Sequence, residues 1–386
     1  MNNKKVALAT LLPVMFGFFI MGFVDIIGMA VNHVKEDFAL TDSTVNLISM
    51  SCYLWFLVLA IPTGMLMNKI GRKSTVLVSF LCHVVAMSIP LINYSFPMML
   101  LAFTLVGIGN TILQVAMNPL VTDVVSGDKL TGTLTLGQFI KAVCSFFGPV
   151  IVSWATGLAF GWKLIFPIYA VLSLLALLWL YFAPIREQKV AATQVSFRPT
   201  FELLKDNVIL LYFIGILVLV GVDVGMNMTF PKFLQERCNL PLSQADLGNS
   251  VYFLARTVGA FAGGVLMLKF SERIFYVASV VVAMIGLVTL ALGNNLIFIL
   301  CCVAIFGLGY ANLFSIIFSL SMQRVPDKAN EVSALLVAGI CGGAVIPSII
   351  GFVTDSFQTQ VAAIVLLAVV WLYMFYLITK VPKPQR

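Results

Sequence analysis

Four ionisable side chains stand inside otherwise apolar stretches of the sequence: Asp25, Lys141, Asp223 and Arg256. On insertion scales a charged side chain at the centre of a bilayer costs about 2.5–3.5 kcal/mol, so each needs a partner or water. One interpretation is structural and pairs each acid with one base, Asp25 with Lys141 and Asp223 with Arg256. The interpretation that we favour is that at least one acid and one base contact a cargo or a coupling ion. Asp25 or Asp223 would then bind that ion, H⁺ or Na⁺.

The sequence lacks the motifs of enzymatic chemistry. It has two histidines, His33 and His83, and no His-Glu-x-x-His motif, nucleophile elbow or phosphate-binding loop. Its seven cysteines have no metal-ligand spacing and lie mostly in apolar stretches. We therefore expect a protein that is not an enzyme and that needs no cofactor or metal.

The composition is that of a membrane protein. Of 386 residues, 61% are hydrophobic and 10% are charged, against about 45–50% and 25% in soluble domains. The formal charge of +7 does not indicate a nucleic-acid partner, because the basic residues are spread between apolar runs rather than gathered in one patch. About 20 apolar residues cross a bilayer. The chain is long enough for twelve such spans with short connections.

Twelve apolar runs are separated by polar turns, and the sequence therefore predicts an all-α polytopic protein with twelve transmembrane helices. No alternating ten-residue pattern of a transmembrane β-barrel repeats. The predicted spans are 6–32, 44–68, 74–93, 96–125, 130–158, 164–183, 207–232, 245–269, 273–292, 295–323, 329–355 and 359–380.

The distribution of Lys and Arg predicts the orientation. Two of these residues, Lys141 and Arg256, lie within spans. The side opposite the termini receives few of the others, and these are Lys35, Lys163, Lys232 and Arg237. Because cytoplasmic connections carry the excess of Lys and Arg, we predict that both termini are cytoplasmic and that the chain is a multi-pass protein of the cytoplasmic (inner) membrane.

An internal repeat divides the chain into two six-span halves. Gly64–Lys69 recurs as Gly264–Lys269, Asp25 is matched by Asp223, and Pro149 is matched by Pro347. Parallel repeats of this kind imply a pseudo-twofold axis along the membrane normal and a site near the midplane between the halves. The boundaries that we predict are an N-terminal half at 1–183, a cytoplasmic linker at 184–206 and a C-terminal half at 207–386.

One segment carries a specific resemblance. The stretch Gly64-Met-Leu-Met-Asn68-Lys-Ile-Gly71-Arg72-Lys73 resembles the signature loop between helices 2 and 3 of the major facilitator superfamily. Its glycines permit a tight turn, and its basic pair would sit at the cytoplasmic surface. The superfamily usually has an acid where Asn68 stands. The resemblance implies that this loop takes part in the conformational change.

Within the superfamily, several stretches resemble the fucose:proton symporter family, namely 107–119, 134–138, 255–259, 314–321 and 342–347. This resemblance implies a secondary active transporter of a sugar-like solute, coupled to H⁺ or Na⁺, that works by alternating access as a monomer. It also implies that five carboxamides line the cavity and bind substrate, because carboxamides donate and accept hydrogen bonds as sugar hydroxyls do. They are Gln114, Asn118, Gln138, Asn227 and Asn312. Otherwise each would make interhelical hydrogen bonds of about 0.6 kcal/mol.

Two departures from the family pattern concern the substrate. Sugar-carrying members have Glu where this chain has Gln114 and Asn where it has Lys141. The superfamily architecture implies that Lys141 and Arg256 face one another across the cavity, which suits an anionic cargo such as an acidic sugar derivative. Three alternatives stay open: a neutral-hexose carrier of the same family, a drug or metabolite exporter, and a channel or non-transporting sensor with the same fold.

Overall fold

The computed structural model describes residues 3–125, 129–155, 157–185, 197–266, 272–325 and 328–382, and these residues are almost entirely helical. The first group of helices comprises α1 (Asn3–Met21), η1 (Gly22–Ile26), α2 (Ile27–Phe38), α3 (Asp42–Val45), α4 (Leu47–Ile70), α5 (Arg72–Ile92), α6 (Phe96–Val124), α7 (Lys129–Ala155), η2 (Gly161–Leu164) and α8 (Ile165–Phe182). The second comprises α9 (Phe197–Glu202), η3 (Leu203–Lys205), α10 (Asn207–Cys238), α11 (Leu242–Ala245), α12 (Leu247–Leu266), α13 (Glu272–Ala291), α14 (Leu296–Tyr310), α15 (Leu313–Arg324), α16 (Ala329–Ala338), η5 (Gly339–Cys341), α17 (Gly342–Phe357), α18 (Gln360–Leu377) and η6 (Ile378–Lys380).

The twelve predicted spans are confirmed in number and approximate position. Within the described residues, 11 helical segments are long and apolar enough to cross a membrane. The twelfth helix is α12, which packs against α7 and α14. Two predicted ends are wrong: the first span continues to Phe38 instead of 32, and the seventh continues to Cys238 instead of 232. Lys35, Lys232 and Arg237, predicted in connections, therefore lie in α2 and α10.

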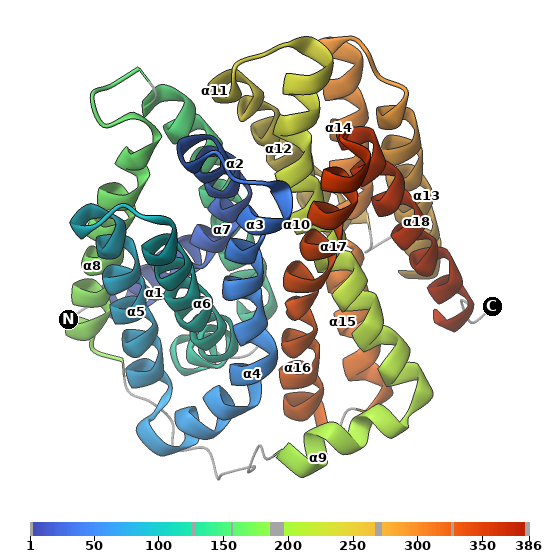
Figure 1. Cartoon of the computed structure of the whole chain (residues 1–386). Helices are drawn as coiled ribbons and strands as arrows, with labels where there is room; N and C mark the ends of the chain where they lie inside the picture. Colours follow the sequence, from blue (N-terminus) through green and yellow to red (C-terminus); the bar gives the residue numbers. More distant parts are fainter. Residues whose placement is uncertain are drawn as a thin grey trace.

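The helices form two bundles, shown in Figure 1, with α1–α8 in one half and α10–α18 in the other. Across the interface, α4 packs against α16 and α17, α2 against α10, and α7 against α12. Within the predicted linker, α9 forms a short helix that packs against α16, while residues 186–196 lie outside the described residues. We call the end of the molecule that carries α3 and α11 the α3 end, and the end that carries α9 and Gly71 the linker end.

Three of the spans are interrupted. The 3₁₀ turn η1 separates α1 from α2, a break at Ala311–Asn312 separates α14 from α15, and η5 separates α16 from α17. Asp25 lies in η1, and Asn312 is the N-cap residue of α15. Interrupted helices are typical of transporter binding sites, because the break turns side chains and backbone groups toward the cavity.

Close glycine contacts set the spacing of the helices around the interface. A Cβ atom on Gly22 would lie 2.8 Å from the carbonyl oxygen of Lys141, so only glycine lets η1 approach α7 this closely. A Cβ atom on Gly343 would lie 2.7 Å from Cγ of Tyr53, so glycine at this position lets α17 approach α4 equally closely. The first of these contacts brings Asp25 next to α7.

The outer surface of the bundles is apolar. Large hydrophobic side chains are exposed on the peripheral helices, among them Leu81 and Val85 of α5 and Phe182 of α8. Buried polar side chains occur in the interior. This arrangement fits a lipid environment, in which the outer helix faces contact hydrocarbon and polar groups need partners inside.

Candidate functional site

The C-terminal half contributes an ion pair at the centre of the interface. Nη1 of Arg256 donates to Oδ2 of Asp223 at 2.8 Å, and the hydroxyl of Tyr252 donates to Oδ1 at 2.5 Å. Asn227 donates to the same Oδ1 at 3.2 Å. The Arg256 guanidinium lies 5.0 Å from the centre of the Tyr310 ring. The second of the two pairs considered from the sequence is therefore present.

The N-terminal half contributes an acid with fewer partners. Oδ2 of Asp25 accepts a hydrogen bond from Oγ of Ser145 at 2.5 Å. Lys141, one turn earlier on α7, interacts electrostatically with Asp25, Asp223 and Arg256. No ion pair of 4.0 Å or less joins Lys141 to Asp25. Of the two pairs, this one is not a direct contact.

The four charges thus meet where the halves meet. Asp25 lies in η1, Lys141 in α7, Asp223 in α10 and Arg256 in α12, and α7 packs against both η1 and α12. The two cations repel one another, while each is attracted by both acids. Tyr53 of α4, which is buried, interacts with three of these charges, Asp25, Asp223 and Arg256. The cluster is balanced as long as both acids are ionised.

The five carboxamides separate into different environments. Gln114 donates to Oδ1 of Asn110 at 2.9 Å, and Asn227 belongs to the Asp223 network. Asn312 is buried and donates to the carbonyl of Gly259 at 2.9 Å, which is an interhelical hydrogen bond. Asn118 and Gln138 are exposed. The contacts of Asn312 favour the structural interpretation for that residue.

The signature segment lies at the linker end. Gly71 has φ of 89°, which glycine adopts without strain, and it separates α4 from α5. Arg72 donates to Oδ1 of Asp123 at 2.8 Å and to the carbonyl of Pro119 at 3.2 Å. Lys73 donates to the carbonyl of Ala183 at 2.8 Å. Gly64 is buried in α4, while the side chain of Asn68 lies outside the described residues. The basic pair thus connects α5 to the ends of α6 and α8.

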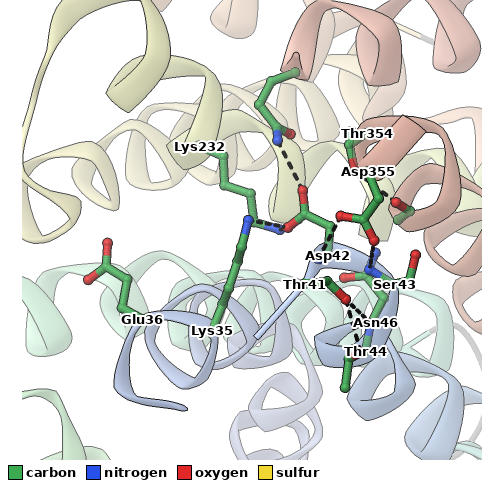
Figure 2. A network of polar contacts seen from close by, with 12 residues as sticks. Lys35, Glu36, Thr41, Asp42, Ser43, Thr44, Asn46, Lys232, Thr354 and Asp355 are labelled. Carbon is green, nitrogen blue, oxygen red and sulfur yellow. Dashed lines mark hydrogen bonds and ion pairs between the residues drawn. The ribbon is translucent and has the colours of Figure 1, made fainter. Parts of the chain in front are cut away.

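A polar network that the sequence did not predict closes the α3 end (Figure 2). Oδ1 of Asp42 accepts from Nζ of Lys35 at 2.7 Å and from Nζ of Lys232 at 2.6 Å. Asp355, from α17, accepts from the backbone amides of Asp42 and Ser43 at 3.0 and 2.8 Å. One carboxylate at the start of α3 is thus held by cations from both halves.

Further contacts join the halves at the same end. Nε2 of His33 lies 2.7 Å from Oδ2 of Asp246, and both side chains are buried. Asn46 donates to the carbonyl of Pro347, and Ser49 donates to that of Gly343, both at 2.7 Å. Thr41 caps α3, and this Thr-Asp-Ser-Thr cap was the one local signal in the sequence that a structured turn follows the first span.

Comparison with known proteins shows the family to which this fold belongs. A family model, Major Facilitator Superfamily, matches residues 14–346 and residues 239–386. The chain belongs to the major facilitator superfamily. The superfamily resemblance of the signature segment is thereby confirmed. As a member of this superfamily the chain is a multi-pass membrane transporter and not an enzyme.

Several superfamily proteins are similar to this transporter along most of its length. A glucose/galactose transporter of Brucella abortus is 26% identical over 362 residues, which cover 89% of this chain and 87% of the relative. A probable nitrate transporter, NarT, of Staphylococcus epidermidis is 26% identical over 306 residues, covering 77% of this chain and 76% of the relative. The crystal structure of the Escherichia coli fucose:proton symporter FucP matches with a TM-score of 0.70 at 16% identity and covers 99% of both chains. This last likeness establishes the fold.

Proposed function

We propose that this superfamily member is a proton-coupled symporter of a sugar-like solute that works by alternating access. The observation that carries the proposal is the unequal bonding of the two acids at the interface. Asp223 is held by an arginine, a tyrosine and an asparagine, whereas Asp25 accepts one hydroxyl. A sugar cargo is supported by the relatedness to the Brucella abortus protein named a glucose/galactose transporter.

Asp25 is the acid that we assign to the coupling proton. Protonation of Asp223 would break its ion pair with Arg256 and leave a partly buried guanidinium without a partner, which is costly. Protonation of Asp25 keeps a hydrogen bond, because the Ser145 hydroxyl can accept from the acid as readily as it donates to the carboxylate. A proton suits this site better than Na⁺, since the hydrogen bond found at Asp25 supplies a single oxygen donor.

Lys141 and Arg256 would recognise an acidic group on the cargo. When Asp25 binds a proton, the cluster changes from balanced to a net charge of one positive, because two cations then face a single carboxylate. An anion is attracted to that state, so proton and acidic cargo would enter together. Lys141 is well suited to this contact, since no direct ion pair with Asp25 occupies its ammonium group.

A second candidate cargo is a small inorganic anion such as nitrate. Two facing cations at the interface favour it. The Staphylococcus epidermidis protein named a probable nitrate transporter has the same 26% identity to this chain as the named sugar transporter, over 306 residues instead of 362. The carboxamides Gln114, Asn118, Gln138 and Asn227 favour a hydroxylated cargo over nitrate, because they supply both donors and acceptors.

The proposal includes the orientation of the protein in the membrane, its oligomeric state and the end that is closed. The N-terminal half at 1–183 and the C-terminal half at 207–386 are joined by the linker at 184–206. The linker end faces the cytoplasm. The protein lies in the inner membrane as a monomer. The α3 end then faces outward and is closed by Asp42, Lys35 and Lys232. Opening of this end would require that these contacts separate, while the Arg72–Asp123 pair holds helices within the N-terminal half.

Uptake into proteoliposomes tests the cargo and the coupling. Purified protein would be reconstituted, and accumulation of radiolabelled D-galactose, D-glucuronate and nitrate would be followed with and without an inward proton gradient. We expect proton-driven accumulation of a sugar, greatest for D-glucuronate, and exchange of label in counterflow. Gradient-driven accumulation of nitrate alone would favour the second candidate, and flux without counterflow would indicate a channel.

A further inference from the structure

A buried side chain that the proposed mechanism does not use lies at the α3 end. Asn32 of α2 is 2% exposed, and among the described residues neither its Nδ2 nor its Oδ1 has a hydrogen-bond partner. Both atoms are enclosed by protein. Proteins leave few buried polar atoms unpaired, because such an atom loses its hydrogen bonds to water and gains none in exchange. The carboxamide of Asn32 therefore destabilises the state in which it is buried.

Asn32 lies where the two halves meet. Its helix, α2, packs against α10 of the other half. Gly28 is one turn earlier on the same side of α2, and a Cβ atom on Gly28 would lie only 3.0 Å from Cβ of Asn227 in α10. Asn32 also borders a small cavity between the two helices, together with Lys232 and Gln235 of α10. When the halves separate at this end, water therefore reaches the carboxamide of Asn32 and satisfies it.

Two other side chains at the α3 end are only partly satisfied. Asn46 donates to the carbonyl of Pro347 across the interface, but its Oδ1 has no partner among the described residues. Oδ2 of Asp246 contacts His33 across the interface, while Oδ1 of Asp246 likewise has no partner in the described part of the chain. Closure of this end thus buries more polar atoms than it pairs.

Closure of the α3 end is therefore subject to two opposing contributions. The carboxylate of Asp42 stabilises the closed state, because it is shared by the ammonium groups of Lys35 and Lys232 (Figure 2). The unpaired atoms of Asn32 act in the other direction, since they are satisfied only when the end is open. A carrier that alternates between two states needs both states to be accessible, so neither contribution can be much larger than the other.

We propose that Asn32 sets the conformational equilibrium of the carrier by destabilising the closed α3 end. The unpaired carboxamide offsets part of the stabilisation that Asp42 provides, and the end therefore reopens. An apolar side chain at this position removes the offset and holds the end closed for longer. The inference rests on alternating access, which belongs to the proposed function, and does not depend on the identity of the cargo.

The labelling rate of a thiol at the α3 end tests this inference. Ser49 is buried and bonds Gly343 across the interface, so the thiol of a Ser49→Cys variant is accessible only when the end is open. A membrane-impermeant maleimide is added on the α3 side of proteoliposomes, and labelling of a chain that keeps Ser49 is subtracted because it reports the native cysteines. When Asn32→Leu is added to Ser49→Cys, we expect labelling to become at least tenfold slower. Tenfold corresponds to about 1.4 kcal/mol, which is within the cost of one unpaired buried group. An unchanged rate would overturn the proposal.

A control variant separates the place of the unpaired atom from its mere presence. Ser173 of α8 is fully buried and its Oγ also has no partner among the described residues, but α8 packs against α1, α5 and α7 of its own half. Ser173→Ala removes an unpaired atom that stays buried in both states, so the labelling rate should not change. An equal slowing by Ser173→Ala and Asn32→Leu would assign the effect to general stability and overturn the proposal.

Two further variants keep the outcome clear. If Asn32→Leu does not fold or is too large to allow closure, Asn32→Val, which is smaller, should slow labelling at least threefold, and an unchanged or faster rate would overturn the proposal. Asp42→Asn opens the same end and shows that the thiol can be reached. Labelling that is absent in every variant, Asp42→Asn included, would contradict opening of the α3 end and with it the proposed alternating access. Labelling that Asp42→Asn accelerates and Asn32→Leu leaves unchanged would overturn only the role of Asn32.

Discussion

The two acids of the interface have the same residue type in corresponding positions of the repeat, but their surroundings give them different properties. Asp223 is 8% exposed and accepts hydrogen bonds from three side chains, including the charged Arg256. Asp25 is partly exposed, and among the described residues its carboxylate hydrogen-bonds Ser145 alone. Loss of the Asp223 charge would break an ion pair with Arg256, whereas the hydrogen bond between Asp25 and Ser145 involves no charged partner.

At the residue scale we first predict the effect of Asp25→Asn. The variant keeps the hydrogen bond with Ser145 but cannot carry a proton, so uptake driven by a proton gradient should fall to simple equilibration. Exchange of labelled for unlabelled cargo in counterflow should continue. Ser153→Ala, a conservative change elsewhere on α7, serves as the control. Accumulation by Asp25→Asn above equilibrium would show that Asp25 is structural.

The second prediction concerns Lys141→Asn. Removing one member of a charged contact with the cargo should weaken binding of D-glucuronate by about 2–5 kcal/mol and leave binding of D-galactose nearly unchanged. Isothermal titration of the purified variant with each sugar measures both effects. Equal losses for the two sugars would assign Lys141 to the helix bundle instead of the cargo.

At the element scale, the α3 end depends on a contact between elements that are distant in the sequence. Asp42→Asn should weaken the bridge between α2 and α10, because Lys35 and Lys232 lose the charge that they share. The Ser49→Cys variant carries a thiol at a position that is buried when the end is closed. When Asp42→Asn is added to this variant, we expect a membrane-impermeant maleimide to label the thiol at least tenfold faster. Asp37→Asn is the control, since Asp37 bonds only within the N-terminal half to Tyr94, Trp162 and Lys163. A labelling rate unchanged by Asp42→Asn would show that this carboxylate does not hold the end closed.

The start of α10 gives a stability prediction. Asp206 caps the helix by accepting from the amides of Val208 and Ile209, and it pairs with Arg324 at 2.9 Å. Burial alone would raise the pKa of Asp206, but hydrogen bonds from Arg324 and the two amides outweigh it and lower the pKa. A lowered pKa means that the stabilisation is complete above the ordinary Asp value of about 3.9 and is lost as the pH falls below it.

Asp206→Ala should therefore lower the stability of the C-terminal half by about 0.5–2 kcal/mol at neutral pH. Asp206→Asn keeps the cap and should cost much less, because the pair with Arg324 is largely exposed. Thermal unfolding of the purified variants, followed by circular dichroism, measures the difference. An equal loss in both variants would mean that the ion pair matters more than the cap.

The same elements show what the sequence could and could not predict. Long apolar runs must form helices in lipid, so the twelve spans and the superfamily fold followed from the sequence. The end of α10 did not follow from the sequence, because a lysine such as Lys232 usually marks the end of an apolar span. The helix continues past this buried lysine because its ammonium group bonds Asp42, which is 190 residues away in the sequence. The sequence also could not show that Asp25 and Lys141 fail to pair directly, since a hydroxyl on the next turn of α7, that of Ser145, bonds the carboxylate instead.

At the scale of the whole molecule, the proposed mechanism combines the charges at the centre with the contacts at the α3 end. Each lies where the two halves meet, so both would be affected when one half moves against the other. Protonation of Asp25 would make the cluster attract an acidic cargo, and the bound cargo would restore its balance. The central claim is that proton and sugar cross together.

The pH of a lightly buffered medium outside proteoliposomes, recorded as cargo is added without an imposed gradient, tests this claim most directly. We predict that D-glucuronate, and to a lesser extent D-galactose, makes the medium more alkaline as the sugar enters with a proton. The shift should be absent with Asp25→Asn and in liposomes without protein. Sugar uptake without a shift, or an equal shift with Asp25→Asn, would contradict proton symport through Asp25.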